Sequence, residues 1–104
     1  MARKVTVLPG VVRETLAVGP SLLVVRFTFE AGAKVPPHRH PHEQSSYILK
    51  GRLRYRIGDR TVVLAPGDAA VIPGDVEHEA EALEAAVDLN SFTPVRADYL
   101  DADA

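Results

Sequence analysis

The sequence contains no cysteine, no long hydrophobic run and no excess of positive charge. Without cysteine, the chain can form no disulfide, thiolate zinc site or iron–sulfur cluster, and it offers no cysteine nucleophile. Its longest aliphatic runs are four residues, as at 22–25, so no segment is expected to span a bilayer. The net charge of −2 argues against a protein that binds nucleic acid by neutralising phosphates.

The remaining composition is that of an ordinary globular domain. Hydrophobic residues make up 46% and charged residues 25% of 104 positions, which excludes a wholly disordered chain and suits a single domain over residues 1–104. Two basic residues stand near the start, but Pro9 and Gly10 interrupt any apolar stretch that a signal peptide would need. We therefore expect a cytoplasmic protein with no membrane or nucleic-acid partner.

Short alternating segments between glycines and prolines predict strands. With 7 glycines and 8 prolines spread along the chain, there is room for strands and little room for helices. Apolar and polar residues alternate at 22–30, 52–57 and 76–82, which is the pattern of strands with one buried face. Eight to ten such strands must close on themselves to bury that face. We predict an all-β fold, either a sandwich or a barrel, in which only 95–104 could form a helical turn.

Two strand faces carry further expectations. The strand at 52–57 places Arg52, Arg54 and Arg56 on one side, which we expect to be solvated and opposed by glutamates of the 76–82 segment. A register one residue different would turn these arginines inward and create an anion pocket. Tyr47 and Leu49 would point out of the barrel, and such a patch usually meets another subunit or a terminal strand. We expect a homodimer, with a covering N-terminal strand as the alternative.

All four histidines lie in two short segments, which indicates a metal site. Alternate residues of an extended chain face the same way, so His38 and His40 can share a metal ion. A further ligand has to come from a distant strand. His78 can supply it because its neighbours on the same face, Ala80 and Ala82, are small and leave space. An exposed histidine-rich loop is the alternative.

The spacing of these residues closely resembles the two motifs of the cupin superfamily, small β-barrels of jelly-roll type. The resemblance covers roughly residues 19–96, which would form the core barrel. The first motif sets two histidines between glycines, and the second places the last histidine after a proline turn. The matching residues are Gly32, His38, His40, Gln44 and Gly51 in the first motif, and Gly67, Pro73, Gly74 and His78 in the second.

The resemblance implies one divalent metal ion, held by the three motif histidines and residue 44. Nickel, zinc, manganese, iron and cobalt all suit such ligands, so the sequence leaves the metal open. Residue 44 is Gln44 where cupins usually have a carboxylate, and Glu43 or His42 could replace it as a ligand. Three imidazoles and an amide leave a divalent ion with its full charge, which favours an anionic partner such as a carboxylate.

Longer stretches resemble one cupin subgroup, the pectin-degradation cupins that linearise 4,5-unsaturated uronates. The similarity lies in 38–51 and 90–100, and that subgroup also uses three histidines and one glutamine. In it, an aromatic residue and an arginine from the second stretch face the substrate, which implies this role for Phe92 and Arg96. An acidic residue two positions before the aromatic is also implicated there, and Asn90 takes that place in this chain.

The expected substrate carries a carboxylate, which the metal and the guanidinium of Arg96 could hold together. Ring opening also needs proton transfer. Asn90 cannot perform it, so Asp88, Tyr55 or a metal-bound water would take that role. Two further functions stay open: a cupin dioxygenase or isomerase of another small molecule, and a non-catalytic module that binds or senses a small anion.

Each of these side chains also has a purely structural interpretation. Arg96 could pair with Asp98 or Asp101 at the surface. Phe92 and Tyr55 could simply fill the barrel. The structure has to show which of them face a common cavity.

Overall fold

Ten antiparallel strands and one short helix make up residues 4–103, which are the residues that the computed structural model describes. The strand count and the helix at the C-terminal end agree with the sequence pattern. In chain order the elements are β1 (Lys4–Leu8), β2 (Val11–Val18), β3 (Leu23–Phe29), β4 (Lys34–His38), β5 (Glu43–Lys50), β6 (Leu53–Ile57), β7 (Arg60–Leu64), β8 (Ala69–Ile72), β9 (His78–Ala82), β10 (Ala86–Thr93) and α1 (Ala97–Asp103).

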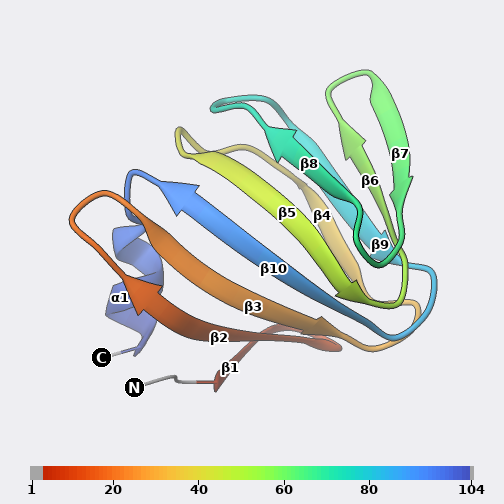
Figure 1. Ribbon diagram of the computed structural model, residues 1–104, viewed down its shortest axis with the longest axis horizontal. Coiled ribbons are helices and arrows are strands. Elements are labelled where there is room, and N and C mark those ends of the chain that lie inside the picture. Colours follow the sequence, from red (N-terminus) through yellow and green to blue (C-terminus); the bar gives the residue numbers. More distant parts are fainter. Residues whose placement is uncertain (1–3, 104) are drawn as a thin grey trace.

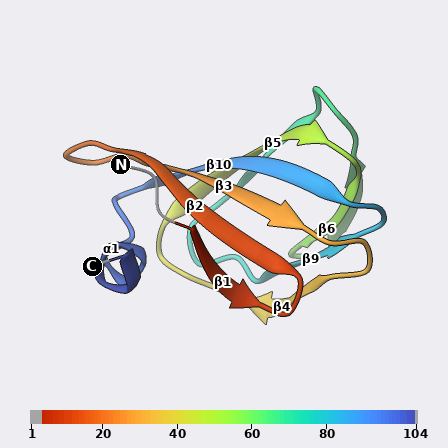
Figure 2. The same cartoon turned by 90° about the horizontal axis from the view of Figure 1, so that it is seen from below.

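The strands form two sheets that face each other around a common interior (Figures 1 and 2). The six-stranded sheet has the order β1-β2-β3-β10-β5-β8, and the four-stranded sheet has the order β4-β9-β6-β7. Strands distant in the chain become neighbours, as where β10 pairs with both β3 and β5. This arrangement is the predicted jelly-roll type of β-barrel. The helix α1 lies at one end of it (Figure 2).

Period-two alternation places the apolar side chains in the interior. Leu23 and Val25 of β3 and Leu53 of β6 have no exposed surface, while their neighbours in sequence face outward. Burial of each such side chain contributes roughly 1.5–3 kcal/mol to stability. The main buried cluster consists of Val11, Phe29, Ile48, Leu53, Tyr55, Ile57, Leu64, Ile72, Ala80, Ala82 and Ala86.

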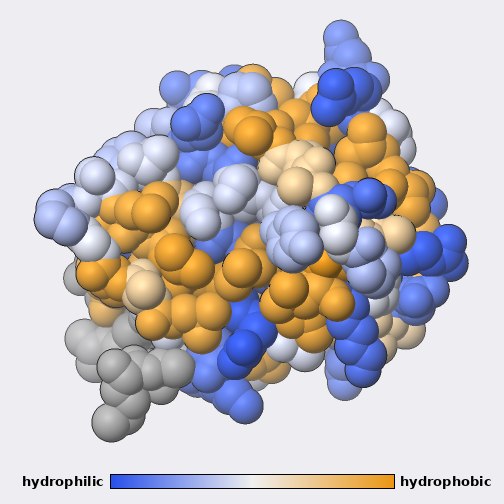
Figure 3. Space-filling model, viewed as in Figure 1, coloured by the Kyte–Doolittle hydropathy of each residue, from blue (hydrophilic) through white to orange (hydrophobic). Residues whose placement is uncertain are grey.

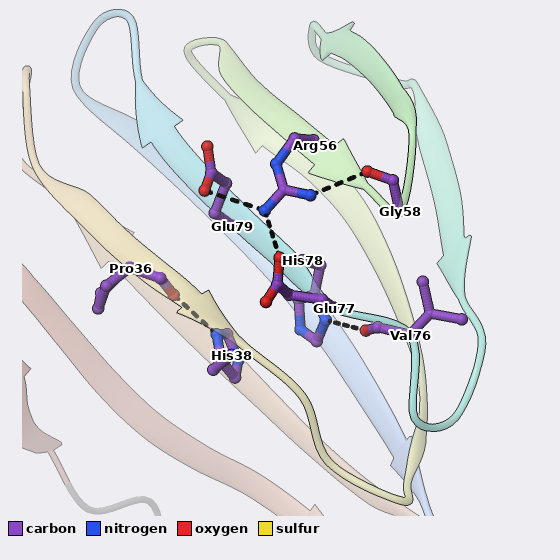
Figure 4. A network of polar contacts seen from close by, with 8 residues as sticks. All are labelled: Pro36, His38, Arg56, Gly58, Val76, Glu77, His78 and Glu79. Carbon is purple, nitrogen blue, oxygen red and sulfur yellow. Dashed lines mark hydrogen bonds and ion pairs between the residues drawn. The ribbon is translucent and has the colours of Figure 1, made fainter.

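The arginines of β6 face solvent, as expected. Arg54 pairs with Glu81, and Arg56 pairs with Glu77 and Glu79, because β6 lies beside β9. Figure 4 shows the contacts of Arg56. The two Arg56 contacts measure 2.9 and 3.2 Å. Exposed pairs of this kind contribute at most about 1 kcal/mol each. The alternative register, with these arginines turned inward around an anion pocket, is wrong.

The barrel extends to the N-terminal side of the predicted core of residues 19–96. Strands β1 and β2 join the six-stranded sheet, and Val11 of β2 pairs with Phe29 of β3. Val11 has no exposed surface and belongs to the main cluster. Neither strand contains a motif residue, so the resemblance could not include them.

An apolar patch stays uncovered on the outer face of the six-stranded sheet. Tyr47, Leu49 and Val71 are 43%, 48% and 56% exposed. Figure 3 shows hydrophobic surface on the side of the molecule seen in Figure 1. Strand β1 lies at one edge of the sheet, and three strands separate it from β5. The alternative of a covering N-terminal strand is therefore wrong, and a second subunit stays a prediction.

The helix α1 packs against the end of the barrel. Its residues Tyr99 and Leu100 contact a small cluster formed by Leu23, Val25 and Phe92. No helix among residues 4–103 is long and apolar enough to cross a bilayer. The packing of α1 fixes the segment that directly precedes it next to the barrel interior.

Candidate metal centre and cavity

Three histidines come together in the interior. His38 ends β4, His78 opens β9, and the two residues are register partners in the four-stranded sheet. The ring centroids of His38 and His40 lie 4.2 and 4.9 Å from that of His78. One ligand nitrogen from each of the three lies within 4.8 Å of the others, close enough to share a metal ion. His42 is half-buried and lies outside this group.

Backbone carbonyls orient all three rings. Figure 4 shows this for His38 and His78, whose Nδ1 atoms lie near the carbonyl oxygens of the residues two positions before them. A carbonyl oxygen only accepts hydrogen bonds, so each Nδ1 carries the proton and each neutral ring keeps a free lone pair on Nε2. The Nδ1 contacts are His38 to Pro36 at 3.0 Å, His40 to His42 at 3.0 Å and His78 to Val76 at 2.9 Å.

The surroundings of the site keep the rings of His40 and His78 neutral. Burial is the main cause that lowers the pKa of His78 to about 4. The nearby His38, His40 and Arg96 lower it further, and the hydrogen bond to Val76 opposes the shift. The pKa of His40 is also lowered, first by burial and then by Arg96. Neutral imidazole is the form that binds a metal, so the site can accept an ion at neutral pH.

Gln44 faces the same interior. Its side chain is buried in β5, whereas Glu43 is exposed on the other side of that strand. The amide Nε2 of Gln44 donates a hydrogen bond of 2.5 Å to Oδ1 of Asn90. This bond turns Oε1 of Gln44 towards His40, where it lies 3.0 Å from Nε2. Asn90 thus holds the amide in the orientation that a metal ligand needs.

Two observations show that this donor set fits a divalent metal. The Nε2 of His40 and the Oε1 of Gln44 both present lone pairs, yet they lie 3.0 Å apart, a contact that a shared cation would make favourable. The Nε2 of His78 is buried and has no hydrogen-bond partner among the described residues. A bound ion would satisfy all three atoms. Several first-row metals suit imidazole and amide ligands, so the identity of the ion stays open.

A cavity of about 250 Å³ adjoins the histidines. Its polar lining consists of His38, His78, Gln44, Arg96 and Glu79, and Tyr55 also lines it. Glu79 forms an ion pair with Arg56. The other walls are mostly apolar side chains from β1, β2, β3 and β4, including Val7, Val11, Phe27 and Val35. A small molecule in this space would meet the metal ligands and a guanidinium on one side and apolar walls elsewhere.

Phe92 and Arg96 both line this cavity. Phe92 is 1% exposed, and its ring contacts that of His40 edge-on with a centroid distance of 5.8 Å. The guanidinium carbon of Arg96 lies 5.1 Å from the centre of the Phe92 ring. Arg96 also forms an ion pair of 2.9 Å with Asp98, which is exposed. Phe92 therefore packs in the interior and Arg96 pairs with Asp98, and both residues also lie on the cavity wall.

Comparison with known proteins agrees with this architecture. A family model described as a cupin domain matches residues 25–89, which include both histidine motifs. The chain belongs to the cupin family. The structure of KdgF from Halomonas sp. is 34% identical to this cupin with a TM-score of 0.89, over 93% of this chain and 90% of that chain. An RmlC-like cupin from Shewanella frigidimarina NCIMB 400 is 28% identical with a TM-score of 0.89, over 94% and 88%. A search of curated proteins gave no match.

A buried carboxylate of this cupin is connected to the cavity. Asp88 has no exposed surface and accepts hydrogen bonds from Ser46 at 2.5 Å and Tyr55 at 2.6 Å. Burial raises the pKa of Asp88, and these two hydrogen bonds oppose the shift. Burial and the nearby Asp88 raise the pKa of Tyr55 well above its usual range. Tyr55 lines the cavity and Asp88 does not, so Tyr55 is the member of this pair that a ligand can reach.

Sequence reasoning missed two residues near the site of this cupin. Tyr99 lines the cavity, and Arg13 packs against Tyr99 without any exposed surface. The available signal for Arg13 was its place between Val11 and Thr15, on the inward side of an alternating stretch. Tyr99 offered no such signal, because its position depends on how α1 packs.

Proposed function

We propose that this cupin is a metal-dependent enzyme that acts on a small carboxylate, and that its reaction is the ring opening of a 4,5-unsaturated uronate. The main support is a cavity lined by His38, His78, Arg96 and Tyr55, beside three histidines whose nitrogens are close enough to share a metal ion. The likeness to KdgF from Halomonas sp. and the motif resemblance to uronate-linearising cupins support the same reaction.

The cavity suits a carboxylate that is attached to a ring. Three imidazoles and an amide do not neutralise a divalent ion, and Arg96 adds a second positive group, so an anionic head would be drawn to this part of the cavity. The apolar walls would contact the ring carbons and exclude water. Exclusion of water strengthens the electrostatic interactions at the polar end.

Opening of the ring is an isomerisation. The bond between C1 and the ring oxygen breaks, the C1 hydroxyl loses its proton as an aldehyde forms, and C4 gains a proton as the enol becomes a ketone. A metal ion, when bound, supplies positive charge that stabilises negative charge on oxygen. We assign the proton transfer at carbon to Tyr55, which stays protonated because its pKa is raised. The proton that the C1 hydroxyl releases restores Tyr55, and Asp88, which accepts a hydrogen bond from Tyr55, holds that hydroxyl in place.

One observation favours a second function, that of a non-catalytic module that binds a small carboxylate. Asn90 stands where the resembling enzymes have an acid, and its side chain is engaged in holding Gln44. Such a module would keep the metal and Arg96 and would turn over no substrate.

The reaction is tested with zinc-loaded and nickel-loaded protein and 4,5-unsaturated galacturonate. We expect loss of the ultraviolet absorbance of the enol ether, and no loss in chelated protein or in the His78→Ala variant. Glu84→Gln, an exposed change outside the cavity, serves as the control. Binding of the uronate without turnover, measured by calorimetry, would support the binding module, and the absence of binding would exclude both functions.

A further inference from the structure

Tyr99 contacts two guanidinium groups that are far apart in the chain. The guanidinium carbon of Arg13 lies 4.1 Å from the centre of the Tyr99 ring, and that of Arg96 lies 4.0 Å from it. A guanidinium on an aromatic face is attracted by the ring electrons. Phe92 and Phe27 meet the same ring edge-on, with centroids 5.5 and 6.3 Å away. Tyr99 is thus fixed from several directions at the wall of the cavity.

The contacts of Arg96 leave one edge of its guanidinium for a ligand. Nε and Nη2 donate to Asp98 at 3.3 and 2.9 Å, and Nη1 donates to the hydroxyl of Tyr99 at 2.9 Å. A guanidinium has five N–H donors, and these contacts within residues 4–100 use three of them. The other two are one N–H on Nη1 and one on Nη2. Such a pair matches the two oxygens of a carboxylate.

Arg13 stands behind this arrangement. It has no exposed surface, does not line the cavity and donates a hydrogen bond of 3.2 Å to the hydroxyl of Thr15. Arg13 and Arg96 both lie on the Tyr99 ring, so the ring is held between a buried side chain of β2 and the guanidinium at the cavity wall.

We propose that Arg13 and Tyr99 are positioning residues for the carboxylate-binding edge of Arg96. Arg13 fixes the ring of Tyr99, Tyr99 fixes the guanidinium of Arg96, and the free edge of Arg96 receives the carboxylate. The proposal rests on the proposed function of the cavity as a carboxylate site. It places no contact between Arg13 and the substrate.

The test compares two ligands of zinc-loaded protein by calorimetry. D-Galacturonate requires both the metal and Arg96, whereas imidazole binds the metal without a carboxylate. We expect Tyr99→Leu and Arg13→Met to weaken galacturonate binding by about tenfold, the effect of a misaligned charge-assisted bond. Arg13→Lys keeps the charge without the planar stack, and Tyr99→Phe keeps the ring without the hydroxyl. Both variants should therefore lose less galacturonate affinity than Arg13→Met and Tyr99→Leu. Imidazole affinity and zinc content should stay at the wild-type level, and Arg52→Met, at an exposed arginine, should change nothing.

The outcomes separate this proposal from the proposed function. If the wild-type protein binds no galacturonate, both fall. If the wild-type binds it and a folded Tyr99→Leu variant binds it equally well, only the positioning role is overturned. Equal losses for galacturonate and imidazole would show that Tyr99 supports the metal site instead, which also overturns the role. Should Arg13→Met fail to fold, the Tyr99 and Arg13→Lys variants still decide the question.

Discussion

Tyr55 donates a hydrogen bond of 2.6 Å to Asp88 across the barrel interior, from the four-stranded sheet to the six-stranded sheet. Tyr55 lines the cavity, and Asp88 has no exposed surface. The bond therefore connects a buried carboxylate to the space beside the histidines. The proposed chemistry therefore depends on the packing of the two sheets around one interior.

Tyr55→Phe removes the hydroxyl that we assign to proton transfer and keeps the ring in the core. We expect kcat on 4,5-unsaturated galacturonate to fall by about 10²–10³-fold, the usual contribution of a positioned acid or base. KM and zinc content should change little, because we assign the hydroxyl neither to substrate binding nor to the metal. Steady-state kinetics with metal analysis measures this. Tyr47→Phe, at an exposed tyrosine, is the matched control, and a kcat of Tyr55→Phe within twofold of wild type would contradict the assignment.

Asp88→Asn should stabilise the protein at neutral pH. Burial raises the pKa of Asp88 in the folded state, so its contribution to stability is present at acid pH and is lost as the pH rises through that pKa. Ionisation of a buried carboxyl costs free energy that an amide avoids. We expect a gain of about 1 kcal/mol in the free energy of unfolding at pH 7 and none at about pH 3.

Urea unfolding at the two pH values measures this difference. The same variant should lose turnover, because an amide accepts a weaker hydrogen bond from Tyr55 than a carboxylate does and holds the hydroxyl less firmly. A variant that is less stable than wild type at both pH values would show that the hydrogen bonds to Ser46 and Tyr55 outweigh the burial of charge.

Local patterns predicted most of the fold. Alternation placed Leu53 and Tyr55 inside and Arg54 outside, because a one-residue shift would expose the whole apolar set. The glycines and prolines marked the turns between these strands. The stretch 4–18 was left out of the predicted core because it contains no motif, although Val11 is fully buried there.

The site also has a part that the sequence predicted and a part that it could not predict. Spacing along the chain predicted that His38, His40 and His78 would meet, and the structure brings their nitrogens together. The contact between Arg13 and Tyr99 could not be predicted, because it depends on the docking of α1 against a strand from the start of the chain. Contacts between distant segments carry no local periodicity.

Gly51→Ala should be much more damaging than Gly32→Ala. Both glycines have positive φ, 74° and 82°, so a side chain is strained at each. At Gly51 an added Cβ would also collide with the carbonyl oxygen of Ala85 and lie 2.7 Å from the Cα of Ala86, whereas at Gly32 it would meet nothing within 4 Å. We expect losses of more than about 3 kcal/mol and of about 1 kcal/mol in the free energy of unfolding. Chemical denaturation measures both, and equal losses would refute the steric argument.

The exposed patch of Tyr47, Leu49 and Val71 predicts a homodimer through the outer face of the six-stranded sheet. Light scattering coupled to size exclusion should give twice the monomer mass for the wild type. Leu49→Lys should shift the protein to monomer, because a charge would be buried in the interface. Val63→Lys, at an equally exposed valine on the other sheet, should leave the dimer intact. A monomeric wild type would show that no such interface exists. A dimer sensitive only to Val63→Lys would place the interface on the other sheet.

Gln44→Glu tests whether the neutral ligand set attracts the substrate. A carboxylate in place of the amide would reduce the net charge of the metal site, so we expect zinc to bind about tenfold tighter and galacturonate to bind about tenfold more weakly. Competition with a chromophoric chelator measures the first affinity, and calorimetry with zinc-loaded protein measures the second. Glu43→Gln changes a charge at the adjacent exposed position and should alter neither. If Gln44→Glu tightens zinc binding and leaves galacturonate affinity unchanged, the charge of the ion is not what draws the carboxylate, and Arg96 alone carries that role.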